Sequence, residues 1–401
     1  MNGGSRGIHI GRLFGIQIAI DYSWLFIVVL LTWSLTVGFR HVHPDWSGAL
    51  AVGTAFAATL LFFASVVLHE LAHSVVARRF GVPVSSITLF LLGGISNIER
   101  EPPSAKAEFW TAVVGPLTSI VLGIALLWIG SAAVSVPAAA VVDPYAILGR
   151  LGPAGTLLMW LGPVNIIVGI FNLIPAFPLD GGRLLRSAIW ATTRSLHAAT
   201  RWASAIGQAV GWFFIFVGVA IVFGANVPFF GGGIVSGVWL AFIGWFLSSA
   251  AAQTWRRQLV HEVVEGLTVA RLMRPVGRVV APDTVVSSLV DDWLLRHEER
   301  SYPVVDESGR LLGIITMADV RAAPRGTWST TPVSRVMTPF GRLVTTTARE
   351  DLGEALEKLA RADVSQLPVV DGQRLIGLLL RSDIARWIEL HIQPRARTFA
   401  H

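Results

Sequence analysis

Six apolar segments occupy most of the first 250 residues, and they constrain the fold more than any other feature of the sequence. Most are near the ~20 residues that a membrane-spanning helix requires. Charged residues make up only 14% of the 401 residues, against about 25% in ordinary globular proteins. The sequence therefore predicts a polytopic α-helical protein of the cell membrane, embedded in the lipid bilayer. The predicted spans are residues 22–38, 50–80, 107–131, 156–178, 203–224 and 233–252.

Lys and Arg residues in the short connections predict the orientation of these spans, because cytoplasmic loops carry an excess of such residues. With the N-terminus inside, only Arg40 and Arg150 fall outside. The ten residues on the cytoplasmic side are Arg6, Arg12, Arg78, Arg79, Arg100, Lys106, Arg183, Arg186, Arg194 and Arg201. The tail that begins at Arg256 and Arg257 is then predicted to be cytoplasmic as well.

The second span contains the sequence His69-Glu70-Leu-Ala-His73. Histidines four residues apart on a helix project from one face about one turn apart, so both imidazoles can bind one Zn²⁺. Glu70 is close enough to take a proton from a metal-bound water. Ionisable groups at membrane depth cost roughly 3 kcal/mol or more without a partner, so a metal site is favoured. A structural or proton-relay cluster is the alternative.

A third zinc ligand is predicted at Asp180, in the Asp-Gly-Gly sequence after the fourth span. The second and fourth spans both run from outside to inside, which places Asp180 at a depth similar to that of the histidines. Three protein ligands leave a fourth tetrahedral position for water or substrate, as catalytic zinc requires. A simple turn or a helix-end cap is the alternative for this aspartate.

Two further features of the spans point toward the same region. Asn165 and Asn172 lie seven residues apart on the fourth span and share a face. Their amides can join helices, or Asn172 can donate a hydrogen bond to the oxyanion of the reaction, and both alternatives stay open. Gly115 and Pro116 in the third span permit close approach of the backbone near the site.

Short β segments are predicted at residues 1–21, where apolar residues alternate, and at 84–99, which are too β-branched for another span. The second pair of strands should break at Gly93-Gly94. Unpaired strand edges cannot face lipid, so this backbone should be covered by protein or line a wet cavity near the zinc. Such an edge could hold an extended substrate by strand addition, whereas a plain cytoplasmic hairpin is the alternative.

Taken together, these motifs resemble the site-2 proteases, which are intramembrane zinc metalloproteases of peptidase family M50. The resemblance spans all six helices. It implies that His69, His73 and Asp180 bind one zinc per chain, that Glu70 activates the water and that Asn172 assists. It also implies a substrate, a single-span membrane protein such as an anti-sigma factor, cleaved within or near its transmembrane segment. Ser119 departs from many relatives, which carry Asn there, and this leaves its partner open.

The remaining sequence, from about Val269, contains two copies of one module offset by 64 or 65 residues. Residues 270–275 return at 334–339, and residues 312–319 return at 376–383. The copies resemble a pair of cystathionine-β-synthase (CBS) domains, a soluble α/β module that can hold adenine nucleotides or form a homodimer. The predicted domains are residues 1–255 for the protease, 256–266 for a linker, 267–325 and 332–390 for the CBS pair, and 391–401 for a disordered tail.

The two copies of the CBS module differ at one position that bears on nucleotide binding. In the first, the resemblance implies that the Thr316 hydroxyl meets phosphate while Asp319 accepts from ribose hydroxyls. The second copy keeps Asp383 but has Leu380 in place of the threonine. One adenine-nucleotide site is therefore predicted, with a packing or dimerising module without ligand as the alternative.

The main rival function is a CBS-regulated ion or metal transporter, in which the same polar residues form a transit site. A transit pathway needs polar groups spread across the bilayer, whereas here they gather at one depth. The net charge of +6 comes from basic residues beside the spans, so no nucleic-acid partner is predicted. The absence of cysteine excludes disulfides and thiolate ligands.

Overall fold

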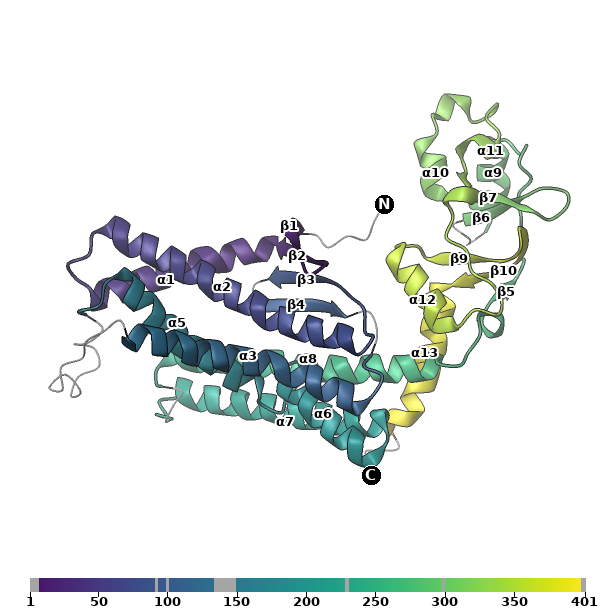
Figure 1. Cartoon of the computed structure of the whole chain (residues 1–401). Helices are drawn as coiled ribbons and strands as arrows, with labels where there is room; N and C mark the ends of the chain where they lie inside the picture. The colour runs from purple at the N-terminus through teal and green to yellow at the C-terminus, as the bar shows by residue number, and fades with distance from the viewer. Residues whose placement is uncertain are drawn as a thin grey trace. The chain divides into compact units, whose positions relative to one another are not determined.

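The computed structural model describes residues 7–90, 93–98, 101–132, 149–227, 231–297, 299 and 301–397. Arg6 and Arg100 of the charge count therefore lie outside the described residues, as do residues 1–6 of the first predicted β segment. The chain forms two compact units that meet in sequence between Gln258 and Leu259. Figure 1 follows both units along the chain.

Six helices among the described residues are long and apolar enough to cross a membrane, which confirms the predicted number of spans. They are α1 (Tyr22–Val42), α2 (Gly48–Arg79), α3 (Ala105–Ala132), α5 (Pro153–Asn172), α7 (Leu196–Val222) and α8 (Ile234–Val264).

Two helix ends differ from the prediction. The helix α5 ends at Asn172 rather than near residue 178, because Pro175 and Pro178 follow and proline disfavours helix in itself and in the residue before it. The helix α8 continues to Val264, through most of the predicted linker at 256–266. Residues 245–265 contain no glycine or proline, and Gly266, which follows, has a positive φ of 72°.

An additional helix, α6 (Asp180–Thr193), was not predicted from the sequence. It begins at Asp180, which was expected to lie in a turn or helix end just after the fourth span, and it contacts α3 and α7. Its glycine pair favours a turn by composition, yet the structure places both glycines inside the first turn of a helix. Asp180 is thus the first residue of a separate helix.

A four-stranded sheet belongs to the same unit, and its strands confirm the predicted β segments. The strands are β1 (Gly7–Leu13), β2 (Ile16–Asp21), β3 (Val84–Phe90) and β4 (Gly93–Ile98). They lie in the order β1-β2-β3-β4, with β2 and β3 parallel and the other pairs antiparallel. The strands β3 and β4 contact α2, beside which they run in Figure 1. Ile16, Ile87 and Leu71 join sheet and helix in one buried cluster.

The second unit holds two three-stranded sheets, each of which takes one strand from the other copy of the repeat. The first sheet has the order β5-β10-β9, with β5 (Arg274–Pro275), β9 (Gln366–Asp371) and β10 (Arg374–Leu380). The second has the order β6-β7-β8, with β6 (Ser301–Val305), β7 (Leu311–Thr316) and β8 (Thr338–Pro339). This strand exchange joins the two copies in one compact unit.

Short helices complete the second unit. They are α9 (Val286–Leu289), α10 (Met317–Ala322), α11 (Val333–Val336), α12 (Leu352–Arg361) and α13 (Arg381–Arg397), with single turns at Val269–Arg271, Val290–Leu294, Arg325–Thr327 and Phe340–Arg342. The helix α13 extends to Arg397, into residues for which disorder was predicted, and residues 398–401 lie outside the described chain. Val264, in the last turn of α8, is buried with Leu352 and Leu359 of α12.

Candidate metal centre and active site

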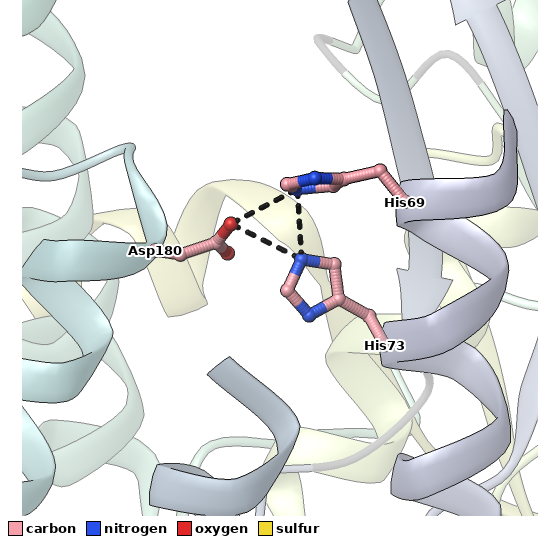
Figure 2. Close-up of side chains that lie close together, drawn as sticks. All are labelled: His69, His73 and Asp180. Carbon is pink, nitrogen blue, oxygen red and sulfur yellow. Dashed lines mark hydrogen bonds and ion pairs between the residues drawn. The ribbon is translucent and has the colours of Figure 1, made fainter. Parts of the chain in front are cut away.

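Three predicted ligands converge on one point between α2 and α6. The Nε2 atoms of His69 and His73 lie 3.1 Å apart, and each lies 3.1 Å from Oδ2 of Asp180. Both histidines are buried, and the aspartate is half-buried. Figure 2 shows the two imidazoles, one turn apart on α2, facing the carboxylate across the gap between the helices.

The geometry of this triangle fits a zinc ion. Ligand atoms about 2.0–2.1 Å from a tetrahedral zinc lie about 3.3–3.4 Å from one another. The three separations of 3.1 Å approach this value closely. Two imidazole nitrogens with one carboxylate oxygen also form a donor set that catalytic zinc uses. His69, His73 and Asp180 can therefore hold one zinc ion and leave a fourth position for water or substrate.

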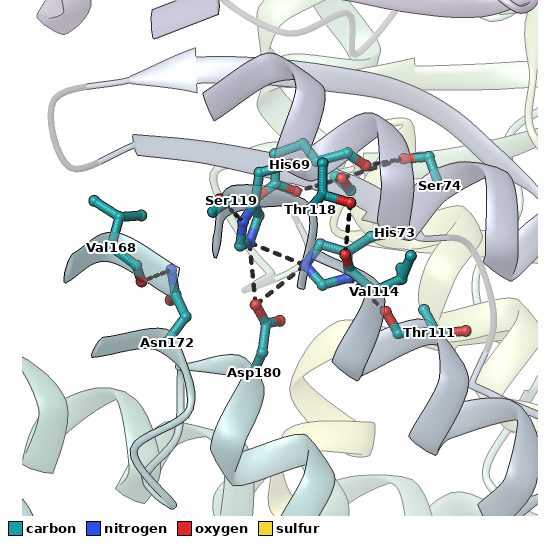
Figure 3. Close-up of polar contacts among 12 residues, drawn as sticks. His69, His73, Ser74, Thr111, Val114, Thr118, Ser119, Val168, Asn172 and Asp180 are labelled. Atoms are coloured by element: carbon teal, nitrogen blue, oxygen red, sulfur yellow. Dashed lines mark hydrogen bonds and ion pairs between the residues drawn. The ribbon is translucent and has the colours of Figure 1, made fainter. Parts of the chain in front are cut away.

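The hydrogen bonds on the far side of each imidazole support this assignment. Nδ1 of His73 faces the backbone carbonyl oxygen of Thr111, which can only accept, so Nδ1 carries the proton. Nδ1 of His69 lies 2.9 Å from Oγ of Ser119, which can accept in the same way. Each neutral ring then turns a lone pair on Nε2 toward the other ring and the carboxylate, an arrangement that a cation stabilises. Figure 3 shows both contacts, which come from α3.

Gly115 on α3 keeps the ligand atoms accessible to a metal ion. A methyl group at this position would lie 2.1 Å from Nε2 of His73 and 2.7 Å from Nε2 of His69. Both distances are far below van der Waals contact, so any larger residue would displace the imidazoles. The sequence indicated close backbone approach at this glycine but did not indicate that the ligand atoms themselves were the neighbours.

The position of Asp180 follows from how α6 begins. Gly181 and Gly182 allow the first turn to lie against the backbone of Leu173 to Phe177, because a side chain at Gly181 would lie 2.2 Å from the carbonyl oxygen of Ile174. The first turn of a helix also favours a negative charge. The aspartate is therefore both held in place and electrostatically favoured at the N-terminus of α6.

A buried ion pair joins α6 to α3. Arg186 of α6 donates through Nε to Oε1 of Glu108 at 2.6 Å, and its Nη2 contacts the same oxygen. Glu108 is fully buried and Arg186 is 8% exposed. The ring of Phe177 lies 5.7 Å from the guanidinium carbon. Because leaving one member of a buried pair without the other is strongly unfavourable, this contact stabilises α6 beside the helix that supports both histidines.

Glu70, the predicted base, lies on the turn between the two histidines and contacts the sheet. Ser96 of β4 donates to its Oε2 at 2.6 Å. A methyl group at Gly94 of the same strand would lie 2.6 Å from Cγ of Glu70, so the strand passes directly against this side chain. The carboxylate is therefore held by β4 rather than by the ligand histidines.

Asn172 and Asn165 make hydrogen bonds within their own helix. The amide nitrogen of Asn172 donates to the carbonyl oxygen of Val168 at 3.0 Å, and that of Asn165 donates to Leu161 at 2.9 Å. In Figure 3 Asn172 lies beside the metal centre, joined to Val168 alone. The predicted role of Asn172 in oxyanion binding therefore stays a prediction.

The residues predicted to bind nucleotide are engaged with protein groups in both copies of the repeat. In the first copy, Thr316 caps α10 and its hydroxyl donates to Oδ2 of Asp319 at 2.6 Å. In the second, Asp383 accepts a hydrogen bond of 2.6 Å from Nε of Arg274 and another from its Nη2. The hydrogen bonds from Arg274 to Asp383 raise the pKa of the guanidinium. The predicted ribose-binding carboxylates thus differ in their partners, one local and one from the other copy.

Several contacts of the site were missed by reasoning from the sequence. The backbone carbonyl of Thr111 carries no side-chain signal at all. Ser96 is one of several polar residues in a short β segment, and nothing in its spacing singles it out. An isolated glutamate such as Glu108 near the start of an apolar span was the one available signal, because such a charge needs a buried partner.

Comparison with known proteins places this geometry in a family. The sequence model of peptidase family M50 matches residues 57–218, and that of the CBS domain matches residues 269–326 and 333–390. The Rip3 protein of Mycobacterium tuberculosis is 33% identical over 391 residues, covering 96% of this chain and 93% of Rip3. The chain belongs to peptidase family M50. This M50 protein is also similar to the zinc metalloprotease MJ0392 of Methanocaldococcus jannaschii. The two are 28% identical over 380 residues, and the alignment covers 94% of this chain and 95% of MJ0392.

The solved structure of a site-2 protease from Methanocaldococcus jannaschii is 27% identical to this M50 protein, with a TM-score of 0.40. The alignment covers 62% of this chain and 95% of that structure. The predicted resemblance to M50 peptidases with a CBS pair is confirmed by the family matches. This M50 protein is a multi-pass membrane protein and an intramembrane zinc metalloprotease with a pair of CBS domains. The rival transporter function is not supported by these relatives.

Proposed function

We propose that this protease hydrolyses peptide bonds within or near the transmembrane segment of single-span membrane proteins, with its zinc held by His69, His73 and Asp180. The convergence of three ligand atoms within 3.1 Å of one another supports this proposal most strongly. The atoms come from two helices, at positions 107 residues or more apart in the sequence, and each imidazole is oriented by a second contact.

The protein's own residues would act around the metal as follows. A bound zinc supplies a Lewis acid, which polarises the scissile carbonyl and makes water nucleophilic near neutral pH. Glu70 accepts the proton of the attacking water at its carboxylate and returns it to the leaving amine. Asn172 gives up its bond to Val168 and donates to the oxyanion. Thr111 and Ser119 keep both imidazoles in the orientation that points Nε2 at the metal.

The strand β4 offers a place for the substrate. It is an edge of the four-stranded sheet as far as the structure describes it, and an extended peptide can add to such an edge through main-chain hydrogen bonds. Because β4 contacts Glu70, a peptide bound at this edge would lie beside the base. We propose that anti-sigma factors are among the single-span substrates that bind there after local unwinding of their helix.

The orientation and the CBS pair complete the proposal. The ten-to-two distribution of Lys and Arg supports a cytoplasmic location for the N-terminus and the CBS pair. A reporter enzyme that works only in the cytoplasm should therefore be active when it is fused after Arg257, and one that works only outside the cytoplasm should be inactive there. The first CBS copy binds one adenine nucleotide through Thr316 and Asp319, and the pair also provides a surface for a homodimer.

The experiment that tests the proposed mechanism combines metal analysis with cleavage. The purified protein should contain about one zinc per chain, Glu70→Gln should keep that zinc and lose cleavage, and Asp180→Ala should lose the zinc. The substrate is a synthetic single-span peptide, reconstituted with the enzyme and carrying a fluorophore and a quencher on either side of its transmembrane segment. Cleavage by Glu70→Gln protein at the normal rate would contradict the proposed mechanism.

A further inference from the structure

The side chain of Glu70 contacts the strand β4 rather than the metal ligands. Val66, Glu70 and Ser74 lie at four-residue intervals on α2 and therefore form one stripe of the helix. The backbone of β4 passes over this stripe, because a methyl group at Gly94 would lie 2.6 Å from Cγ of Glu70 and 3.5 Å from Cγ1 of Val66. The strand thus fixes the space in which the carboxylate can move.

Ser96, two residues along the same strand, makes the direct contact with this carboxylate. Its Oγ donates to Oε2 of Glu70 at 2.6 Å. Ser74 donates to the backbone carbonyl oxygen of Glu70 at 2.8 Å, and its Oγ lies 3.4 Å from that of Ser96. A hydroxyl has one proton, so the proton of Ser96 is committed to Glu70. One carboxylate oxygen is held in this way, and within the described part of the chain the other, Oε1, makes no hydrogen bond.

We propose that Ser96 is a positioning residue for the reaction, which holds Oε2 of Glu70 so that Oε1 faces the attacking water. The inference rests on the proposed role of Glu70 as the base. A glutamate side chain has three rotatable bonds, and a displacement of about 1 Å in a reacting group can lower a rate by about 100-fold. One hydrogen bond from a rigid strand removes most of that freedom.

The hairpin itself does not require the Ser96 side chain. Ser96 is opposite Ile87 of β3, and the two strands are joined by backbone hydrogen bonds, which do not involve the serine side chain. The side chain therefore acts on Glu70 and not on the pairing of the strands. Because β4 is also the edge at which we propose that the substrate binds, the substrate and Glu70 would contact the same strand.

A matched pair of substitutions separates positioning from folding. Valine and threonine have nearly the same shape and both favour strands, but only threonine keeps the hydroxyl. In the full-length protein, Ser96→Val should lower kcat for the reconstituted fluorogenic single-span peptide by about 10- to 100-fold, with KM and zinc content unchanged. Ser96→Thr should restore most of the activity.

A second measurement follows the hydrogen bond without the reaction. In zinc-free protein, the infrared carboxylate band of Glu70 is assigned by difference from Glu70→Gln protein. This band should shift in Ser96→Val protein and stay close to its normal position in Ser96→Thr protein. The spectrum reports on the contact itself, so it is independent of metal loading and of the substrate.

The outcomes distinguish this inference from the proposed function. If Glu70→Gln is inactive while Ser96→Val has a normal kcat and an unshifted band, the positioning role is wrong and the mechanism stands. If Ser96→Val and Ser96→Thr lose activity equally, or if either loses zinc, the residue serves the fold and the inference is overturned. Normal cleavage by Glu70→Gln overturns the role of the base and the inference together.

Discussion

The metal centre and the predicted nucleotide-binding residues of the CBS pair are supported in different ways. Each imidazole of the centre is held by a group from another helix, as Ser119 holds His69. In the CBS pair, Thr316 bonds to Asp319 only three residues away, and Asp383 bonds to an exposed arginine of the other copy. The comparison teaches that the centre depends on how closely helices approach, whereas Thr316 and Asp319 depend on a contact within one turn and Asp383 on an ion pair with an exposed side chain. Small changes in packing should therefore disrupt the first far more than the second.

The largest effect is expected from one methyl group at the metal centre. Gly115→Ala would place Cβ 2.1 Å from Nε2 of His73, so we expect loss of most bound zinc and of cleavage. Alanine is the better helix former by about 0.5–1 kcal/mol, so a loss would not reflect helix propensity. Metal analysis by mass spectrometry measures the outcome.

Gly53→Ala is the matched control for this substitution. Gly53 lies inside α2, and a methyl group there meets no atom within 4 Å. We expect this variant to retain its zinc. Full zinc content in the Gly115→Ala protein would show that α2 and α3 can move apart to make room for the methyl group. It would contradict the claim that the metal centre is more sensitive to packing than the CBS pair.

A smaller effect is expected from Ser119→Ala, which removes the partner of Nδ1 in His69. Losing such a contact behind a ligand typically weakens metal affinity by 10- to 100-fold. Competition with a chelator measures this affinity in the purified protein. Thr118→Val is the control, because the hydroxyl of Thr118 donates to Val114 of its own helix and not to the site. Equal affinities in the two variants would remove Ser119 from the metal centre.

The smallest effect on structure is expected in the CBS pair. Asp319→Ala should weaken binding of an adenine nucleotide by about 10- to 100-fold, the equivalent of one hydrogen bond to a charged group, while the protein keeps its zinc. Asp383→Ala should leave that binding nearly unchanged, because Leu380 gives phosphate no hydroxyl in the second copy. Calorimetry with the full-length protein decides between them. Loss of binding only with Asp383→Ala would reverse the assignment of the two copies.

The predictions made from the sequence differ in quality along the chain for a physical reason. The spans and the repeat were predicted correctly in number because hydrophobic runs and repeated motifs are local properties. The helix α6 was missed because its first residues, Asp180 to Gly182, have the composition of a turn. The glycines are required there because a neighbouring backbone lies within 3 Å of where their side chains would be. Composition alone does not distinguish these two uses of glycine.

The sequence by itself determined that His69 and His73 share one face of a membrane helix, because residue spacing on a helix is set by its backbone hydrogen bonds. It also indicated Asp180 as a partner, through topology. Only the tertiary structure decided that Gly115 lies against both ligand nitrogens, and that Ser96 holds Glu70. Those contacts depend on the distance between separate helices and strands, which packing of the whole unit sets and no local spacing encodes.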